Sequence, residues 1–227
     1  MSVDAVESPQ LAQLSAAARV MGIELTDLQR GQLLQYMGLI QKWNKVYNLT
    51  ALRDPAEMLT HHLLDSLAAV PPLQALLGQL RQRHGDKPVS LLDVGSGAGL
   101  PGVVFAICCP QLQVSCVDTV GKKAAFVQQA GVELGLPHLR GVHARVENLI
   151  ERFDIISSRA FASLADFTAW SQQALAEEGV WLAMKGKTPT DEMASLPSTV
   201  DVFHVEQLSV PSLEADRCIV WMRQRKV

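Results

Sequence analysis

One stretch, residues 89–102, carries the residue types best suited to binding a nucleotide. It reads VSLLDVGSGAGLPG, with Asp93 two positions before the first of its glycines. Those glycines recur at short intervals: Gly95, Gly97, Gly99 and Gly102. Glycine adopts positive φ and lets a backbone approach a ligand without a Cβ in the way. The apolar residues on either side predict a buried strand before the turn and a helix after it, an arrangement typical of the nucleotide-binding edge of an α/β sheet.

The spacing of these glycines distinguishes among ligands. The pattern is G-x-G-x-G rather than the dinucleotide pattern G-x-G-x-x-G, because Leu100 stands where the third glycine of the latter belongs. No Lys followed by Ser or Thr comes directly after the turn, which argues against a phosphate-binding P-loop. A second apolar strand, residues 114–117, ends on Asp118, whose carboxylate can accept hydrogen bonds from ribose hydroxyls. S-adenosylmethionine has a ribose and an amino group but no phosphate, and it fits this pattern best; a dinucleotide and a turn without a ligand are the alternatives.

Other candidate residues follow the later strands of the same predicted sheet. Arg159 comes at the end of a strand and is expected to lie over the same edge as the glycine turn. Val146 and Glu147 follow the preceding strand, where they can hydrogen-bond an adenine ring. Basic residues near this edge are candidates for an anionic substrate: Lys122, Arg145 and Lys185.

The N-terminal part of the chain adds two weaker signals. Arg53 lies near Trp43 and Tyr47, and basic residues with aromatics between them can bind RNA through phosphates and stacking, although Trp43 is equally suited to a core. Glu57, His61 and Asp65 share one predicted helix face, which is more typical of an ordinary polar face than of a metal site, so no metal is expected. Motifs of serine hydrolases and zinc proteases are missing from the sequence.

The composition limits the class of protein. The chain has 227 residues, of which 48% are hydrophobic, and a net charge of −3, so an RNA-binding surface would have to be a local basic patch on an acidic protein. Its four cysteines lack metal-ligand spacing, and we expect them to be buried and reduced. No signal core or membrane span is evident, so we expect a cytoplasmic protein without a membrane partner. Nothing in the helical patterns requires a dimer, and we expect a monomer.

The predicted elements divide the chain into three parts. We expect a leader and a first helix in residues 1–22, a helical cap in residues 23–85, and a Rossmann-like domain in residues 86–227. A capping box at Thr26 begins the second helix, which is expected to end near Asn44. Another helix is expected to run from Asp54-Pro55 to Val70, with residues 79–87 as a connector. Seven strands are then predicted, mostly parallel with helices on both faces, at residues 89–94, 114–117, 141–144, 154–157, 180–184, 202–210 and 218–222.

Several motifs together resemble the glucose-inhibited division protein B family, also called ribosomal RNA small subunit methyltransferase G. They are KWNKVYNLTALRDP (42–55), HHLLDSL (61–67), LLDVGSGAGLPG (91–102), SRAFASL (158–164) and MKGK (184–187). The match covers roughly residues 23–227. The resemblance implies a class I S-adenosylmethionine-dependent methyltransferase that acts on 16S rRNA of the small ribosomal subunit. The methyl group would go to N7 of one guanine in the 530 loop, leaving S-adenosyl-L-homocysteine.

The resemblance also implies the site residues. The family's cofactor contacts fall on Gly95, Leu100, Val146, Glu147 and Arg159. The pattern of residues adds Asp93, Gly97, Gly99 and Asp118 to the cofactor site. The expected substrate residues are Arg53, Lys122, Arg145 and Lys185. No acid or base is expected among the catalytic residues, because guanine N7 already carries a free lone pair.

Two other hypotheses stay open. A small-molecule methyltransferase would have an enclosed pocket lined by cap residues such as Trp43 and Tyr47. A non-catalytic module would bind the cofactor and methylate no RNA. The rRNA enzyme instead predicts one basic face near the cofactor that includes Arg53, Arg145 and Lys185.

Overall fold

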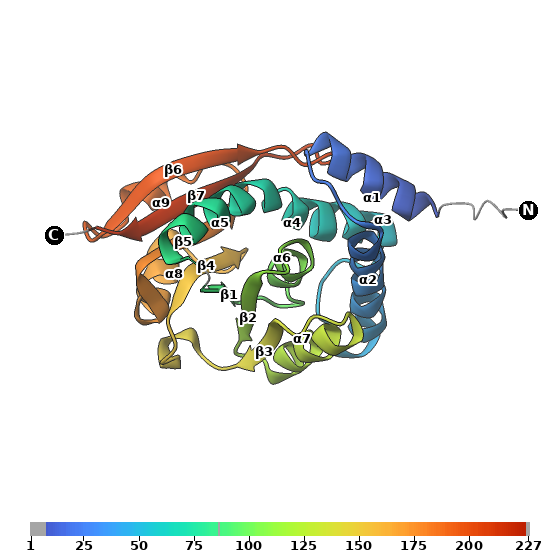
Figure 1. Cartoon of the computed structure of the whole chain (residues 1–227), viewed down its shortest axis with the longest axis horizontal. Helices are drawn as coiled ribbons and strands as arrows, with labels where there is room; N and C mark the ends of the chain where they lie inside the picture. Colours follow the sequence, from blue (N-terminus) through green and yellow to red (C-terminus); the bar gives the residue numbers. More distant parts are fainter. Residues whose placement is uncertain (1–7, 86, 226–227) are drawn as a thin grey trace, which may run out of the picture.

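Seven strands form one sheet in the order β3-β2-β1-β4-β5-β7-β6 (Figure 1). The computed structural model describes residues 8–85 and 87–225. The strands are β1 (Val89–Val94), β2 (Leu112–Asp118), β3 (Leu139–His143), β4 (Phe153–Arg159), β5 (Leu175–Lys185), β6 (Val200–Leu208) and β7 (Arg217–Gln224). The first five pair in parallel, and β7 is antiparallel to both of its neighbours. This topology confirms the predicted seven-stranded, mostly parallel sheet, whose last two strands, β6 and β7, form an antiparallel pair.

Two apolar clusters cover the two faces of the sheet. Successive residues of β1, Leu91 and Leu92, belong to different clusters, because successive side chains of a strand point to opposite faces. The larger cluster joins the sheet to α6 (Gly102–Cys108), α7 (Gly121–Glu133) and the N-terminal helices. The smaller cluster joins it to α8 (Leu164–Ser171) and to the neighbourhood of α9 (Thr190–Ala194). All four cysteines are buried and free, as expected.

The N-terminal helices pack on one side of this sheet, next to α6 and α7 (Figure 1). They are α1 (Pro9–Val20), α2 (Asp27–Tyr47), α3 (Pro55–Met58), the π-helix η1 (Leu59–Leu64), α4 (Asp65–Leu67) and α5 (Val70–His84). Thr26 forms the predicted capping box with Gln29 at the start of α2. The first seven residues of the predicted leader lie outside the described residues, and the division of the chain at residues 22 and 85 stays a prediction.

Two predicted boundaries in this region were wrong. Helix α2 continues past Asn44 to Tyr47, since the buried Asn44 side chain bonds the backbone of Thr50 and Leu52 instead of ending the helix. The predicted connector at residues 79–87 is helical as far as His84. Pro71 and Pro72 begin α5, where their missing N–H groups cost no hydrogen bond, and an apolar stripe then holds the helix on the core: Leu73, Leu77 and Leu80.

Helix α2 is fastened to the helices behind the glycine turn by three glutamines. Their Nε2 atoms donate to backbone carbonyls at the ends of α6 and α7: Gln29 to Ile107 (3.0 Å), Gln32 to Leu134 (2.8 Å) and Gln35 to Glu133 (3.2 Å). Carbonyls at a helix C-terminus lack partners within the helix, so these bonds satisfy groups that the helices leave open. None of the described helices combines the length and apolar character that crossing a membrane requires.

Candidate active site

The glycine turn folds over the carboxyl ends of β1 and β2. Gly95, Gly97 and Gly99 have φ values of 65°, 58° and 87°, which favour glycine. The amide of Gly95 donates to the carbonyl of Val117 at 2.9 Å, and the amide of Gly97 donates to Oδ2 of Asp118 at 3.0 Å. The turn is therefore held to the neighbouring strand from both backbone and side chain.

Asp118 has hydrogen-bonding capacity left for a ligand. Its Oδ1 accepts from the amide of Val120 at 2.8 Å, and its Oδ2 accepts from Gly97. The ammonium of Lys123 lies 3.9 Å from Oδ2. A carboxylate offers about four lone-pair sites, so the two backbone bonds fix this side chain without saturating it.

Asp93 lies fully buried beneath the turn. Its Oδ2 accepts from the amide of Gly102 at 2.9 Å, and its Oδ1 accepts from the hydroxyl of Ser157 at 2.9 Å. Burial raises the pKa of Asp93 to about 7, against the opposing effect of these two hydrogen bonds. Asp93 thus joins β1, β4 and the start of α6 at one point under the turn.

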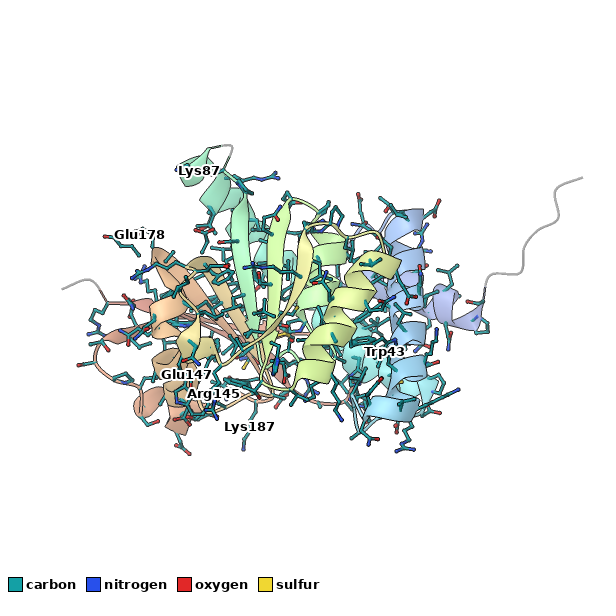
Figure 2. All side chains as sticks on the ribbon, turned by 90° about the horizontal axis from the view of Figure 1, so that it is seen from below. Trp43, Lys87, Arg145, Glu147, Glu178 and Lys187 are labelled. Atoms are coloured by element: carbon teal, nitrogen blue, oxygen red, sulfur yellow. The ribbon has the colours of Figure 1, made fainter. Side chains whose placement is uncertain are left out.

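A cavity of about 440 Å³ opens beside the turn, and we call it the glycine-loop cavity. The ends of three strands and an aromatic pair line it: Gly95, Asp118, Val120, Arg145, Val146, Glu147, Phe161 and Trp170. In Figure 2, Arg145 and Glu147 lie at one end of the molecule together with Lys187, and Lys87, which precedes β1, lies at the opposite end. The cavity therefore belongs to the carboxyl edge of the sheet, where α/β proteins bind their ligands.

A second cavity of about 530 Å³ lies at the same edge, and we call it the arginine cavity. At its base the buried carboxylate of Asp65 accepts from Nη1 of Arg159 at 2.7 Å and from Nε of Arg217 at 2.6 Å. Nη1 of Arg159 also donates to the carbonyl of His61 at 2.9 Å. Two guanidinium groups from two strands thus share one carboxylate from the N-terminal helices.

Phe161 separates the two cavities and lines both. Its ring lies so close to Gly95 that a Cβ at that glycine would be 2.2 Å from the ring. The ring also makes edge-on contacts with Phe167 and Trp170, with centroids 6.4 and 5.8 Å away. Phe161 is thus a wall residue common to both cavities.

Lys185 and Glu192 hold the segment that carries this wall. The ammonium of Lys185 lies 2.9 Å from the carbonyl of Ala162 and 2.8 Å from Oε2 of Glu192. The same Oε2 accepts from the amide of Leu164 at 2.7 Å. These bonds fix both ends of residues 162–164 and use the charge of Lys185 inside the protein.

His62 is a buried polar group beside the arginine cavity. Its Nε2 lies 2.8 Å from Oγ1 of Thr50, and Nδ1 has no partner among the described residues. Burial, with the nearby charge of Arg159, lowers the pKa of His62 to about 4. His62 is therefore a neutral imidazole at ordinary pH.

The chain is similar in sequence to known proteins of one family. Residues 29–220 match the family GidB, rRNA small subunit methyltransferase G. A ribosomal RNA small subunit methyltransferase G from Acidovorax sp. (strain JS42) is 66% identical over 211 residues, covering 92% of this chain and 93% of its own. Its counterpart from Paracidovorax citrulli (strain AAC00-1) is 62% identical over 230 residues, covering 100% and 93%. The chain belongs to the rRNA small subunit methyltransferase G family.

Solved structures agree on the fold. TrmN from Thermus thermophilus matches with a TM-score of 0.52 at 17% identity, covering 74% of this chain and 53% of its own. A SAM-dependent methyltransferase from Aquifex aeolicus matches with a TM-score of 0.50 at 14% identity, covering 77% and 96%. These likenesses support the predicted class I, Rossmann-like methyltransferase fold. Membership of the family makes S-adenosylmethionine the cosubstrate.

The structure brings together most of the residues predicted to bind the cofactor. The glycine-loop cavity is lined by Gly95, Asp118, Val146 and Glu147. Gly97 and Gly99 shape the turn, while Leu100 and Asp93 are buried behind it. Arg159 lies apart from this group, because its guanidinium points to Asp65 in the arginine cavity.

The predicted substrate residues are more scattered. Arg145 is exposed at the glycine-loop cavity, and Lys122 is exposed in the first turn of α7. Lys185 is paired with Glu192, and Arg53 lines a third, smaller cavity with Asn44 and Lys45. The structure does not gather Arg53, Arg145 and Lys185 into one cavity.

The alternative with an enclosed apolar pocket gains no support from the cap. The ring of Trp43 packs edge-on against Phe126 of α7, with centroids 5.4 Å apart, and lies tilted against Tyr47, with centroids 5.2 Å apart. Neither aromatic lines the glycine-loop cavity or the arginine cavity as the described residues form them. Trp43 joins the cap to the sheet instead.

The sequence analysis did not single out Arg217, nor did it predict that Asp65 forms ion pairs with Arg159 and Arg217. Asp65 stood out only as one of three polar residues on a helix face, and Arg217 lies in no motif. Their contact spans 152 positions of the chain. Only a paired change at both positions among relatives would carry a signal for such a contact.

Proposed function

We propose that this chain transfers the methyl group of S-adenosylmethionine to N7 of one guanine of 16S rRNA, in the 530 loop of the small ribosomal subunit. Family membership supports the rRNA substrate, and the two adjoining cavities support a reaction between two separately bound molecules. The observation that carries the proposal is Phe161, which lines both the glycine-loop cavity and the arginine cavity.

The glycine-loop cavity fits S-adenosylmethionine on three observations. Its volume of about 440 Å³ lies in the range of small-molecule sites. Asp118 keeps unsaturated oxygens where a ribose needs acceptors, and Gly95 leaves backbone open to close approach. Val146 and Glu147 line the same cavity and would contact the adenine. When bound, the cosubstrate supplies a methyl group activated by its sulfonium.

The protein's part in this chemistry is positioning. Guanine N7 has an unprotonated lone pair in the plane of the ring, so no residue has to remove a proton. Fixing two reactants in line contributes about 7–11 kcal/mol of barrier reduction in favourable cases. The fixed groups here are the turn, held by Asp118, and the wall, held by Lys185 and Glu192. Accordingly, none of the residues at this edge is assigned an acid–base role.

Direct methyl transfer tests the proposal. Labelled S-adenosylmethionine is offered with small ribosomal subunits and with protein-free rRNA, both lacking the modification, and cleavage at N7-methylguanine locates the product. We expect label at a single 530-loop guanine, and its loss in Asp118→Asn, whose amide removes a charged acceptor. Charged hydrogen bonds contribute about 1.5–3 kcal/mol, so the affinity for S-adenosylmethionine should fall roughly 10- to 150-fold.

The same experiment addresses the second candidate. The net charge of −3 favours a small-molecule substrate over a polyanion. Tight binding of S-adenosylmethionine without label on either RNA would contradict the rRNA proposal and point to a small-molecule substrate or a sensing role.

A further inference from the structure

The arginine cavity holds positive charge in excess of its carboxylates. Arg159 and Arg217 share Asp65 as their acidic partner, and Lys185 is balanced by Glu192. His62 is neutral at ordinary pH because burial lowers its pKa to about 4. Within the described residues, Asp65 is thus the one carboxylate in ion-pair contact with these two guanidinium groups, at a place where their side chains are only 17% and 23% exposed.

Both guanidinium groups keep donors available. Arg217 donates from Nε to Asp65 and from Nη1 to the carbonyl of Asp216. The other N–H donors of its five remain available to a ligand. Arg159 uses only Nη1. Because Asp65 is buried and fixes both side chains, these donors are held in place before any ligand arrives, which lowers the entropy lost on binding.

A second, independent observation points to a ligand in the same place. His62 is 8% exposed and lines this cavity, and its Nδ1 is a buried polar atom without a partner among the described residues. Buried polar groups in native proteins are nearly always satisfied, by protein or by water. The cavity, about 530 Å³, thus combines two guanidinium groups that share one carboxylate, preset donors and an unsatisfied nitrogen.

We propose that Arg217, held by Asp65 beside Arg159, binds a backbone phosphate of the RNA next to the target guanosine; this rests on the function proposed above. A planar guanidinium fork matches the oxygens of a phosphate. The base itself is a poorer partner, because N7 must stay free to react and the ring gains positive charge as it is methylated. Phosphate contact at Arg217 leaves the guanine to face Phe161 and the glycine-loop cavity beyond it.

The test compares Arg217→Gln and Arg217→Lys with Arg223→Gln. Arg223 is a matched control, since it lies on the same strand and also pairs with an aspartate, Asp201, at 2.9 Å, but it lies at the other end of the strand. The measurements are Kd for S-adenosylmethionine, and KM and kcat for small-subunit rRNA over a series of salt concentrations. Thermal unfolding of each variant checks the fold, which retains the Arg159–Asp65 pair.

For Arg217→Gln we expect KM for RNA to rise by about tenfold or more, with Kd for S-adenosylmethionine unchanged. The slope of log kcat/KM against log salt should become shallower by about 0.7–1, the signature of one lost phosphate contact. Arg217→Lys should keep the wild-type salt slope but bind the RNA more weakly, because lysine keeps the positive charge and lacks the planar guanidinium. Arg223→Gln should behave as the unaltered protein.

Three outcomes would overturn the assignment. An Arg217→Gln protein with the wild-type salt slope and KM has lost no phosphate contact. A parallel rise in Kd for S-adenosylmethionine would make Arg217 a support of the cofactor cavity. No methyl transfer to rRNA by the unaltered protein would overturn the proposed function itself, and this assignment with it.

Discussion

The two cavities at the carboxyl edge are built from different chemical groups. The glycine-loop cavity is lined by the backbone of the turn, by the carboxylates of Asp118 and Glu147, and by the cations Lys123 and Arg145. The arginine cavity presents two guanidinium groups on one buried carboxylate. One is therefore suited to a ligand with hydroxyl and amino donors, the other to an anion.

The two cavities also differ in how far apart their residues lie in the chain. The glycine turn and its buried Asp93 come from ten consecutive residues, 93–102. The arginine cavity joins residues of η1 and α4 to the ends of β4 and β5 and the start of β7. Substitutions that affect one cavity and spare the other test whether this separation is real.

The largest effect is expected from Gly95→Ala. The new Cβ would lie 2.2 Å from the ring of Phe161, and φ at this position is 65°. Left-handed backbone costs a non-glycine residue about 1–2 kcal/mol, and the methyl group also enters the cavity. The strain is present with or without a ligand and lowers the free energy of unfolding, whereas the clash with Phe161 acts on the cavity. Overpacking of this kind costs about 1–3 kcal/mol, so we expect the affinity for S-adenosylmethionine, measured by calorimetry, to fall roughly 5- to 150-fold.

Gly135→Ala is the control for backbone strain alone. Gly135 has φ of 67°, and a Cβ there meets no atom within 4 Å. It should lower the free energy of unfolding by a similar amount and leave S-adenosylmethionine binding unchanged. Equal loss of binding in both variants would show that strain, and not the contact with Phe161, governs the cavity.

The residues of the glycine-loop cavity could largely be predicted from the sequence, whereas the contacts of the arginine cavity could not. The sheet, the turn and the roles of Asp93 and Asp118 were readable because each depends on residues close in sequence, or on the rule that parallel strands end at one edge. Arg159 was correctly placed at that edge, but its contact with Asp65 was not foreseen. Helix α5 was misjudged because its polar end, residues 79–84, depends on Leu73 and Leu77 packing against the core. Contacts between distant segments carry no local pattern.

The second prediction concerns Asp93, a buried carboxylate without an ion-pair contact among the described residues. The pKa of Asp93 is raised from 3.8 to about 7, so between these values the folded chain holds a proton that the unfolded chain has lost. The free energy of unfolding should therefore fall as pH rises from about 4 to about 7, and change no further from this group above that. At 1.36 kcal/mol per pKa unit, the loss is at most about 4 kcal/mol.

Asp93→Asn isolates this contribution. The amide keeps an acceptor for Gly102, and the hydroxyl of Ser157 can turn to accept from the new NH₂. Urea unfolding at several pH values should show the variant more stable than the unaltered protein at pH 8, with the difference shrinking towards pH 5. Asp65→Asn should destabilise instead, because two guanidinium groups lose their counterion. A pH-independent difference for Asp93→Asn would contradict the assignment.

The smallest effect is expected from Tyr36→Phe, which tests whether the N-terminal helices support the glycine-loop cavity. The Tyr36 hydroxyl of α2 donates to the carbonyl of Ala98 in the turn at 2.5 Å, and its side chain is fully buried. Removing the hydroxyl leaves that carbonyl unpaired, at a net cost of about 0.5–1.5 kcal/mol, which corresponds to a roughly 2- to 12-fold weaker affinity for S-adenosylmethionine. Tyr47→Phe, near the end of the same helix and 38% exposed, is the matched control.

If Tyr36→Phe lowers the free energy of unfolding but leaves Kd for S-adenosylmethionine at the wild-type value, the hydroxyl stabilises the fold without positioning the turn. If it raises KM for RNA and alters the salt slope, the two cavities are coupled through the cap, and the separation drawn between them fails.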